Sequence, residues 1–154
     1  MNKFDEIDKK ILNILQERGR ITNANLAAEV GLSPPPMLER VKKLEKSGVI
    51  TKYVALLDPK LIDKATIVFV SLSVARHRLQ SFDQVNQELN QFPEVLECYH
   101  ISGDEDYLIK VVVKDIQEYE QFLLKKLATI PSINRIKSTV VLSTIKSGMK
   151  IVVE

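Results

Sequence analysis

The chain of 154 residues contains no tryptophan and only one cysteine, Cys98. A single cysteine cannot form a disulfide within the chain, which excludes the framework of a small disulfide-stapled secreted protein. Cys98 is expected to act as a small apolar residue in a strand. No apolar run approaches the roughly 20 residues that cross a bilayer, and the charged start MNKFDEIDKK lacks the apolar segment of a secretion signal. We therefore expect a cytoplasmic protein with no membrane segment.

The usual signatures of catalysis and metal binding are also missing. The sequence has no P-loop, GxGxxG, GxSxG or HExxH pattern, and His77 and His100 are isolated. We expect no metal, no cofactor and no enzymatic activity. An enzyme stays open as an alternative, because the ferredoxin-like fold indicated below also hosts catalysts.

The net charge of +2 is small, but the positive charge is unevenly distributed. Between residues 33 and 52 the basic side chains are Arg40, Lys42, Lys43, Lys46 and Lys52, against the acidic Glu39 and Glu45. This excess surrounds one predicted helix and is a modest footprint for a polyanion.

The first 50 residues predict three short helices, in 5–18, 22–31 and 33–48. In each, apolar residues recur at three- and four-residue spacing, which gives an amphipathic helix its buried stripe. Each predicted helix begins at a residue that can cap it and ends at a glycine. The caps are Asp5, Thr22 and Ser33, and the glycines are Gly19, Gly31 and Gly48.

The gap between the second and third helices, Gly31-Leu32-Ser33, is a tight turn, so the two helices are expected to cross steeply as in a helix-turn-helix. The third helix would then enter the DNA major groove. Arg40, Lys42 and Lys43 are expected to reach phosphates or guanine edges, and Ser33 with the helix N-terminus to hold a phosphate through backbone donors. The alternative is a three-helix packing unit with a solvated basic face.

From residue 65 onward the pattern predicts an α+β region. Residues 65–75 follow the two-residue rhythm of a strand, with Val68, Val70, Leu72 and Val74 on one face and Ile67, Phe69, Ser71 and Ser73 on the other. The further expected elements are a helix in 81–92, strands in 95–101 and 107–114, a helix in 116–130, a strand in 133–145 and a short terminal strand in 150–153. Residues 50–57 are expected to form a strand that leaves the first region, followed by a linker at Asp58-Pro59.

A weak internal repeat supports a duplicated strand-helix-strand unit. Phe92-Pro93-Glu94-Val95 and Ile130-Pro131-Ser132-Ile133 each end a predicted helix and open a strand. Two such units make the βαββαβ, ferredoxin-like arrangement. The alternative is coincidence, because proline often stands at such joints.

The loop Ser102-Gly103-Asp104-Glu105-Asp106-Tyr107 is a candidate ligand site. Gly103 permits a positive φ, so successive N–H groups can turn toward a carboxylate. Asp104 and Asp106 could pair with an ammonium group, and the two features together would suit a free amino acid. The residues alone favour the plainer alternative, a β-hairpin turn that uses Gly and Asp for its turn chemistry.

Three ordered motifs give the chain a resemblance to the Lrp/AsnC family of feast/famine transcription regulators. They are FDEIDKKILNIL near the start, GLSPPPMLERVKKLEKSGVITKYVALLDP in 31–59, and SGDEDYLIKV in 102–111, which is similar to the family's G-D-x-D-[YF] ligand loop. The resemblance implies a winged-type helix-turn-helix, a ligand-sensing βαββαβ domain, and homodimers that commonly assemble into octamers and bind amino acids or related metabolites between dimers.

The resemblance also implies site residues. The DNA-binding ones are Ser33, Pro34, Pro35, Pro36, Glu39, Arg40, Lys42 and Lys43. The effector-binding ones are Ser102, Gly103, Asp104, Asp106 and Tyr107, with Thr139 and Val140 approaching from a neighbouring subunit. Glu39, where relatives often have a basic or neutral residue, and the triple proline depart from the family pattern and bear on the DNA sequence preferred.

We therefore predict a transcription regulator that binds double-stranded DNA sequence-specifically and responds to an amino acid or related metabolite. Residues 1–50 would form the DNA-binding domain, 51–64 a linker strand and hinge, and 65–154 the ligand-sensing and oligomerisation domain. The alternative function is a metabolite-binding oligomer whose N-terminal unit contacts protein instead of DNA.

Overall fold

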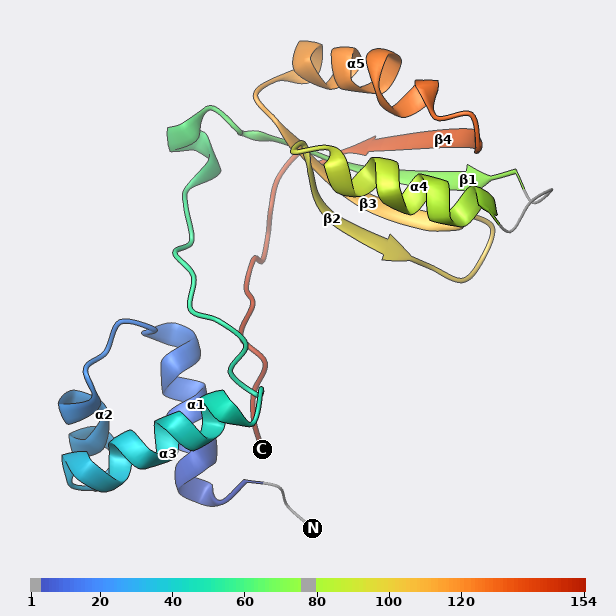
Figure 1. The fold of residues 1–154 in the computed structure, drawn as a ribbon. Helices are drawn as coiled ribbons and strands as arrows, with labels where there is room; N and C mark the ends of the chain where they lie inside the picture. Colours follow the sequence, from blue (N-terminus) through green and yellow to red (C-terminus); the bar gives the residue numbers. More distant parts are fainter. Residues whose placement is uncertain (1–3, 76–79) are drawn as a thin grey trace. The chain divides into compact units, whose positions relative to one another are not determined.

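The computed structural model describes residues 4–75 and 80–154, so His77 lies outside the described residues. The chain forms two compact units. One consists of the residues up to Leu56 together with 146–154, and the other of residues 57–145 (Figure 1). The predicted functional ranges 1–50, 51–64 and 65–154 remain predictions. The C-terminal tail, which was grouped with the sensing region, packs in the first unit.

The N-terminal unit contains the three expected helices, α1 (Glu6–Glu17), α2 (Asn23–Val30) and α3 (Pro34–Lys46). Asp5 and Thr22 cap the first two helices by accepting the N–H groups of Asp8 at 2.8 Å and Asn25 at 3.2 Å. Gly31 ends α2 with φ of +77°, a conformation that glycine adopts without strain. The buried core comes from all three helices and comprises Ile11, Leu12, Leu26, Ala27, Met37, Val41 and Leu44.

Two strands expected in this unit are absent. Residues 51–58 are described throughout but adopt no regular structure, because strand-prone residues need a neighbouring strand to pair with and the described chain supplies none here. Residues 150–153 also form no strand. Their backbone instead bonds to two amide side chains of α1, Asn13 and Gln16.

The C-terminal unit is the expected α+β arrangement. Its elements in chain order are the 3-10 turn η1 (Pro59–Ile62), β1 (Thr66–Val74), α4 (Gln80–Gln91), β2 (Val95–His100), β3 (Tyr107–Val113), α5 (Ile116–Lys125), the 3-10 turn η2 (Leu127–Thr129) and β4 (Ile133–Val140). The antiparallel sheet has the order β2-β3-β1-β4, which confirms the predicted ferredoxin-like βαββαβ topology. β4 stops at Val140, five residues before the predicted end.

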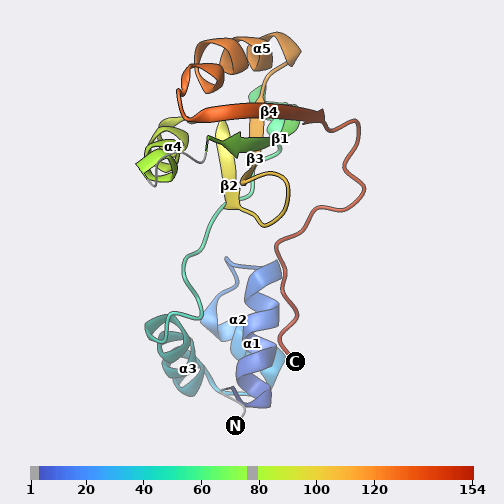
Figure 2. The same cartoon turned by 90° about the vertical axis from the view of Figure 1, so that its right-hand side faces the viewer.

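The alternation in the strands sets the core of this unit. Val68, Val70, Leu72 and Val74 of β1 are buried together with Val85 and Leu89 of α4 and Tyr119 and Phe122 of α5. Both helices therefore cover the same face of the sheet (Figures 1 and 2). No described helix covers the opposite face, where Phe69 pairs in register with Lys110 and Thr139. Cys98 lies in β2, as expected, and is exposed.

Candidate functional site

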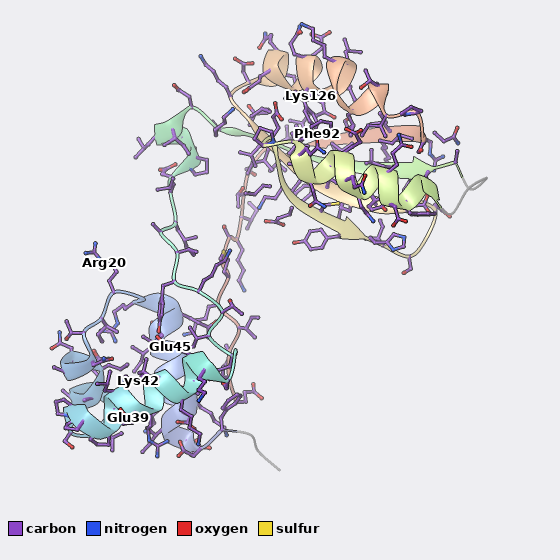
Figure 3. The ribbon with its side chains drawn as sticks, viewed as in Figure 1. Arg20, Glu39, Lys42, Glu45, Phe92 and Lys126 are labelled. Atoms are coloured by element: carbon purple, nitrogen blue, oxygen red, sulfur yellow. The ribbon has the colours of Figure 1, made fainter. Side chains whose placement is uncertain are left out.

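The outer face of α3 is the candidate nucleic-acid interface. Met37, Val41 and Leu44 turn inward, which leaves the other positions of the helix outside. Among the predicted DNA contacts, Ser33, Pro34, Pro35, Pro36, Glu39, Lys42 and Lys43 are all exposed. Glu39 and Lys42 form an ion pair at 3.4 Å on this face (Figure 3). The unit thus exposes an α-helix that carries cations on its surface, and one α-helix fits into the major groove.

Arg40 differs from its neighbours on α3. Its guanidinium donates to Asp5 Oδ2 and Asp8 Oδ1, both at 2.7 Å, and its side chain is only 32% exposed. The hydrogen bond from the Asp8 N–H, and to a smaller extent the one from the Arg40 guanidinium, hold the pKa of Asp5 below its usual range. Arg40 thus ties α3 to the start of α1. Its contact with DNA, expected from the sequence, remains a prediction.

The start of α3 offers few backbone donors for the predicted phosphate contact. Pro34, Pro35 and Pro36 are the first three helical residues, and proline has no N–H group. The next N–H, on Met37, donates to the carbonyl of Ser33 at 3.3 Å. For the same reason Ser33 occupies the N-cap position without a capping bond from its side chain, since the positions it would normally serve lack a donor. The first turn of α3 therefore has no free N–H group of its own to offer a phosphate, and the contact expected through Ser33 remains a prediction.

The loop between β2 and β3 is the candidate effector site. Gly103 has φ of +132°, as its predicted role requires. Ser102, Gly103 and Asp104 are exposed. The Asp106 carboxylate accepts the Val74 N–H at 2.7 Å, and its backbone N–H donates to the Leu72 carbonyl at 2.8 Å. Asp106 therefore anchors the loop to β1, which leaves Asp104 as the more available carboxylate for a ligand ammonium.

Glu105 belongs to the predicted loop, but nothing in the sequence indicated its role. Its carboxylate accepts from Ser73 Oγ at 2.5 Å and from the Arg135 guanidinium at 2.6 Å. The hydrogen bond from the Ser73 hydroxyl lowers the pKa of Glu105, and the hydrogen bond from Arg135 lowers it further by a smaller amount. Ser73 and Arg135 face each other in the β1–β4 register, so only the pairing of the strands reveals this brace.

Tyr107 is buried, with 2% of its surface exposed. Its hydroxyl donates to Asn86 Oδ1 of α4 at 2.8 Å, and its ring lies 5.3 Å from that of His100. Burial raises the pKa of Tyr107. Tyr107 joins the loop to the core, and its predicted contact with an effector remains a prediction.

Thr139 and Val140 lie at the far end of the sheet from this loop. Val140 pairs with Val68 near the start of β1, whereas the loop bonds to Leu72 and Val74 near its end. One chain therefore does not bring the two halves of the predicted effector site together. A site that uses both halves needs a second copy of the chain.

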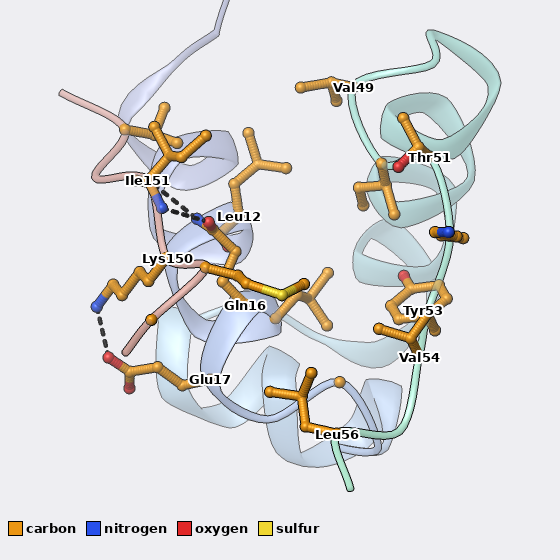
Figure 4. Close-up of a pocket in the computed structure, with 17 residues that line it drawn as sticks. Leu12, Gln16, Glu17, Val49, Thr51, Tyr53, Val54, Leu56, Lys150 and Ile151 are labelled. Atoms are coloured by element: carbon orange, nitrogen blue, oxygen red, sulfur yellow. Dashed lines mark hydrogen bonds and ion pairs between the residues drawn. The ribbon is translucent and has the colours of Figure 1, made fainter. Parts of the chain in front are cut away.

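The N-terminal unit also contains a groove of about 790 Å³, which the sequence did not predict. It lies between α1, residues 49–56 and residues 148–153 (Figure 4). Gln16 exchanges two hydrogen bonds with the backbone of Ile151, at 2.9 and 2.8 Å, and Asn13 does the same with Val153, at 3.1 and 3.2 Å. Lys150 forms an ion pair with Glu17. The groove is thus walled by the docked tail.

The geometry of residues 4–75 and 80–154 bears on two other functions, metal binding and membrane insertion. In that part of the chain no group of three or more His, Cys, Asp or Glu side chains is placed to hold a metal ion. None of its helices combines the length and apolarity that a membrane span requires.

Comparison with known proteins accounts for both halves of the chain. Residues 4–51 match the winged helix-turn-helix DNA-binding family, and residues 67–151 match the Lrp/AsnC ligand binding domain. The chain belongs to the Lrp/AsnC family. It is 44% identical over 143 residues to the leucine-responsive regulatory protein of Haemophilus influenzae, which covers 93% of this chain and 86% of that one. It is 41% identical to the leucine-responsive regulatory protein of Klebsiella pneumoniae, with 98% and 92% covered.

Solved structures of transcriptional regulators agree with this assignment. A transcriptional regulator from Neisseria meningitidis, in complex with L-Met, superposes with a TM-score of 0.94 at 33% identity over 97% of this chain and 96% of that one. An AsnC family transcriptional regulator from Agrobacterium tumefaciens gives 0.91 at 40% identity, with 96% of each chain covered. The predicted fold class and family resemblance are therefore confirmed, and the chain is a regulator of the Lrp/AsnC family.

Proposed function

We propose that this chain regulates transcription by binding double-stranded DNA through α3, and that an amino acid or related metabolite controls its assembly and its DNA binding. The observation that carries the proposal is the exposed face of α3, with Lys42, Lys43 and Lys46 outside the core of a helix-turn-helix. Lysine contacts to phosphate would supply most of the affinity and make it strongly salt-dependent. No step of this function requires a cofactor or a catalytic group, and the cytoplasm is the proposed compartment.

The effector class follows from the loop and from a relative. Gly103 is exposed and has a positive φ, so N–H groups of the loop can turn toward the carboxylate of an amino acid. The exposed Asp104 carboxylate can pair with the ammonium group of the same ligand. The Neisseria regulator, determined as an L-Met complex, supports this class. Ser102, Gly103, Asp104, Asp106 and Tyr107 of one subunit would act with Thr139 and Val140 of another.

The proposed assembly is a homodimer that can build an octamer. The sheet face without a helix carries Ile67, Phe69 and Leu108, apolar side chains that a second copy could cover. In a two-fold dimer the α3 helices would enter successive major grooves about 34–36 Å apart on a near-palindromic site.

The test is DNA binding measured by fluorescence anisotropy on duplexes from the region around the protein's own gene, at about 50 mM salt. The double variant Lys42→Ala/Lys43→Ala should weaken binding at least tenfold. It should also reduce the slope of the binding constant against salt concentration, on logarithmic axes, by the amount that corresponds to the loss of up to two phosphate contacts. Lys60→Ala/Lys125→Ala removes the same charge from exposed positions of the other unit and should bind normally. Unchanged affinity in the α3 variant would refute the assigned interface.

The second candidate is a metabolite-binding oligomer whose N-terminal unit contacts protein. Three ion pairs favour it, those of Arg40 with Asp5 and Asp8 and that of Lys42 with Glu39, since all three reduce the positive charge available to DNA. Absence of binding to any duplex at micromolar protein would favour this candidate.

A further inference from the structure

Leu38 is a large apolar residue on the outside of α3, with 39% of its surface exposed. The core positions of the helix are Met37, Val41 and Leu44, so Leu38 is not needed to fill the core. Pro35 lies one turn before Leu38 and is also exposed. The two side chains make a short apolar ridge on the N-terminal half of α3.

Cations border this ridge. Lys42 stands one turn after Leu38, and Lys43 and Lys46 follow toward the end of the helix. Glu39, beside the ridge, is partly neutralised by Lys42 at 3.4 Å. An apolar strip flanked by lysines complements the major groove, where phosphates line both edges and the C5-methyl group of thymine is the apolar feature of the base edges.

The triple proline makes the start of α3 apolar as well. In the first turn of α3 the missing N–H groups of Pro34, Pro35 and Pro36 remove the backbone donors that would hold a phosphate. The turn exposes ring methylene groups in their place. The helix end that approaches the bases is therefore suited to apolar contact more than to hydrogen bonding.

We propose that Leu38, assisted by Pro35, is a specificity-determining residue that contacts thymine methyl groups in the major groove. This inference rests on the proposed function, because it requires α3 to enter DNA. It adds to that function the base, thymine, that the helix prefers. Lys42, Lys43 and Lys46 would set the affinity for any duplex, and Leu38 would set the preference for thymine.

The experiment begins by selecting bound duplexes from a random pool with the full-length protein. Thymine should be enriched at fixed positions of each half-site. The selected duplex is then compared with one in which uracil replaces those thymines, so that only methyl groups are lost. We expect binding to weaken about fourfold per contacted methyl group. In Leu38→Ala the two duplexes should bind equally, and thymine enrichment should disappear when this variant is used for selection.

Two controls separate methyl contact from charge and from DNA shape. Lys46→Ala should weaken binding to both duplexes by the same factor and keep the thymine preference. Leu124→Ala removes an exposed leucine of α5 and should change nothing. If Leu38→Ala still discriminates thymine from uracil as the parent does, the discrimination does not come from Leu38 and the inference is overturned.

The remaining outcomes are also decisive. Parent protein that binds thymine and uracil duplexes equally, or that selects sites without fixed thymines, overturns the role of Leu38 while DNA binding stands. Failure to enrich any duplex overturns the proposed function itself. A circular dichroism melt of Leu38→Ala that matches the parent confirms that the exposed substitution leaves the fold intact.

Discussion

The C-terminal unit buries fourteen side chains of its described part between one sheet and two helices, whereas the three N-terminal helices bury seven. Polar pairs supplement the smaller core. Arg40 bonds to Asp5 and Asp8, and Asn13 and Gln16 hold the tail. Net stability rises with buried apolar area, so the N-terminal unit is expected to be the weaker one and to depend on these polar contacts. The unit assigned to DNA is thus the one most sensitive to changes at its surface.

The largest expected effect comes from truncating the small core. Leu26 is fully buried in the N-terminal unit, and Leu26→Ala should cost about 3 kcal/mol. Hydrogen exchange followed by mass spectrometry should show loss of protection in α1, α2 and α3 with β1 and β3 unchanged. Leu72→Ala, at an equally buried position of β1, is the matched control and should expose only the sheet. Equal loss of protection in both units after Leu26→Ala would mean that they unfold together.

The docked tail gives a smaller effect. Asn13→Ala/Gln16→Ala removes four hydrogen bonds to the backbone of Ile151 and Val153. Each bond contributes about 0.5 kcal/mol when partly exposed, so the N-terminal unit should lose about 2 kcal/mol and residues 150–153 should exchange freely. Gln87→Ala, an exposed amide of α4, serves as the control. Unaltered protection of the tail would show that side-chain amides do not hold it.

A pH-dependent effect is expected at the start of α1. Folding lowers the pKa of Asp5, mainly through the hydrogen bond from the Asp8 N–H and less through Arg40. The ionised form of Asp5 therefore stabilises the folded state at neutral pH. That contribution is lost as the pH falls through the lowered pKa, below about 4. Asp5→Asn keeps a good N-cap but removes the charge. It should lower the thermal midpoint at pH 7, and the difference from the parent should vanish as the pH falls through the lowered pKa of Asp5.

The matched control for this charge is Asp83→Asn, an exposed acid in the first turn of α4. It should not reproduce the convergence. A midpoint difference for Asp5→Asn that persists into acid would assign the effect to capping geometry and not to the ion pair with Arg40.

In both units, the parts that could be predicted from sequence were those set by residues close together in the chain. The alternation of β1 is local information, and it placed Val68, Val70, Leu72 and Val74 on one face, which the structure shows to be the buried one. The spacing of apolar residues and the glycines likewise located α1, α2 and α3. Such patterns follow from the two- and 3.6-residue periods of strands and helices, so they can be read without knowledge of distant partners.

Contacts between distant residues were the part that sequence could not supply. Asn13 and Val153 are 140 positions apart, and an exposed amide on a helix has no pattern that names its partner. Residues 50–57 have the composition of a strand, but composition does not provide a pairing edge. In the candidate effector site the brace from Glu105 to Arg135 depends on the strand register, which the loop sequence does not encode.

The smallest expected effect on folding is at Asp104, and it tests the loop as a ligand site. Asp104 is exposed, so Asp104→Asn should change stability by less than about 0.5 kcal/mol. Asp106→Asn alters the group that accepts the Val74 N–H and should destabilise the sheet unit more. The parent, screened with the twenty amino acids by thermal shift, should show a raised midpoint with a selective binder. That shift should be reduced in Asp104→Asn because a neutral amide pairs poorly with an ammonium. If the variant keeps the full shift with the same amino acid, another carboxylate holds the ammonium, and the exposed half of the loop serves only as a turn.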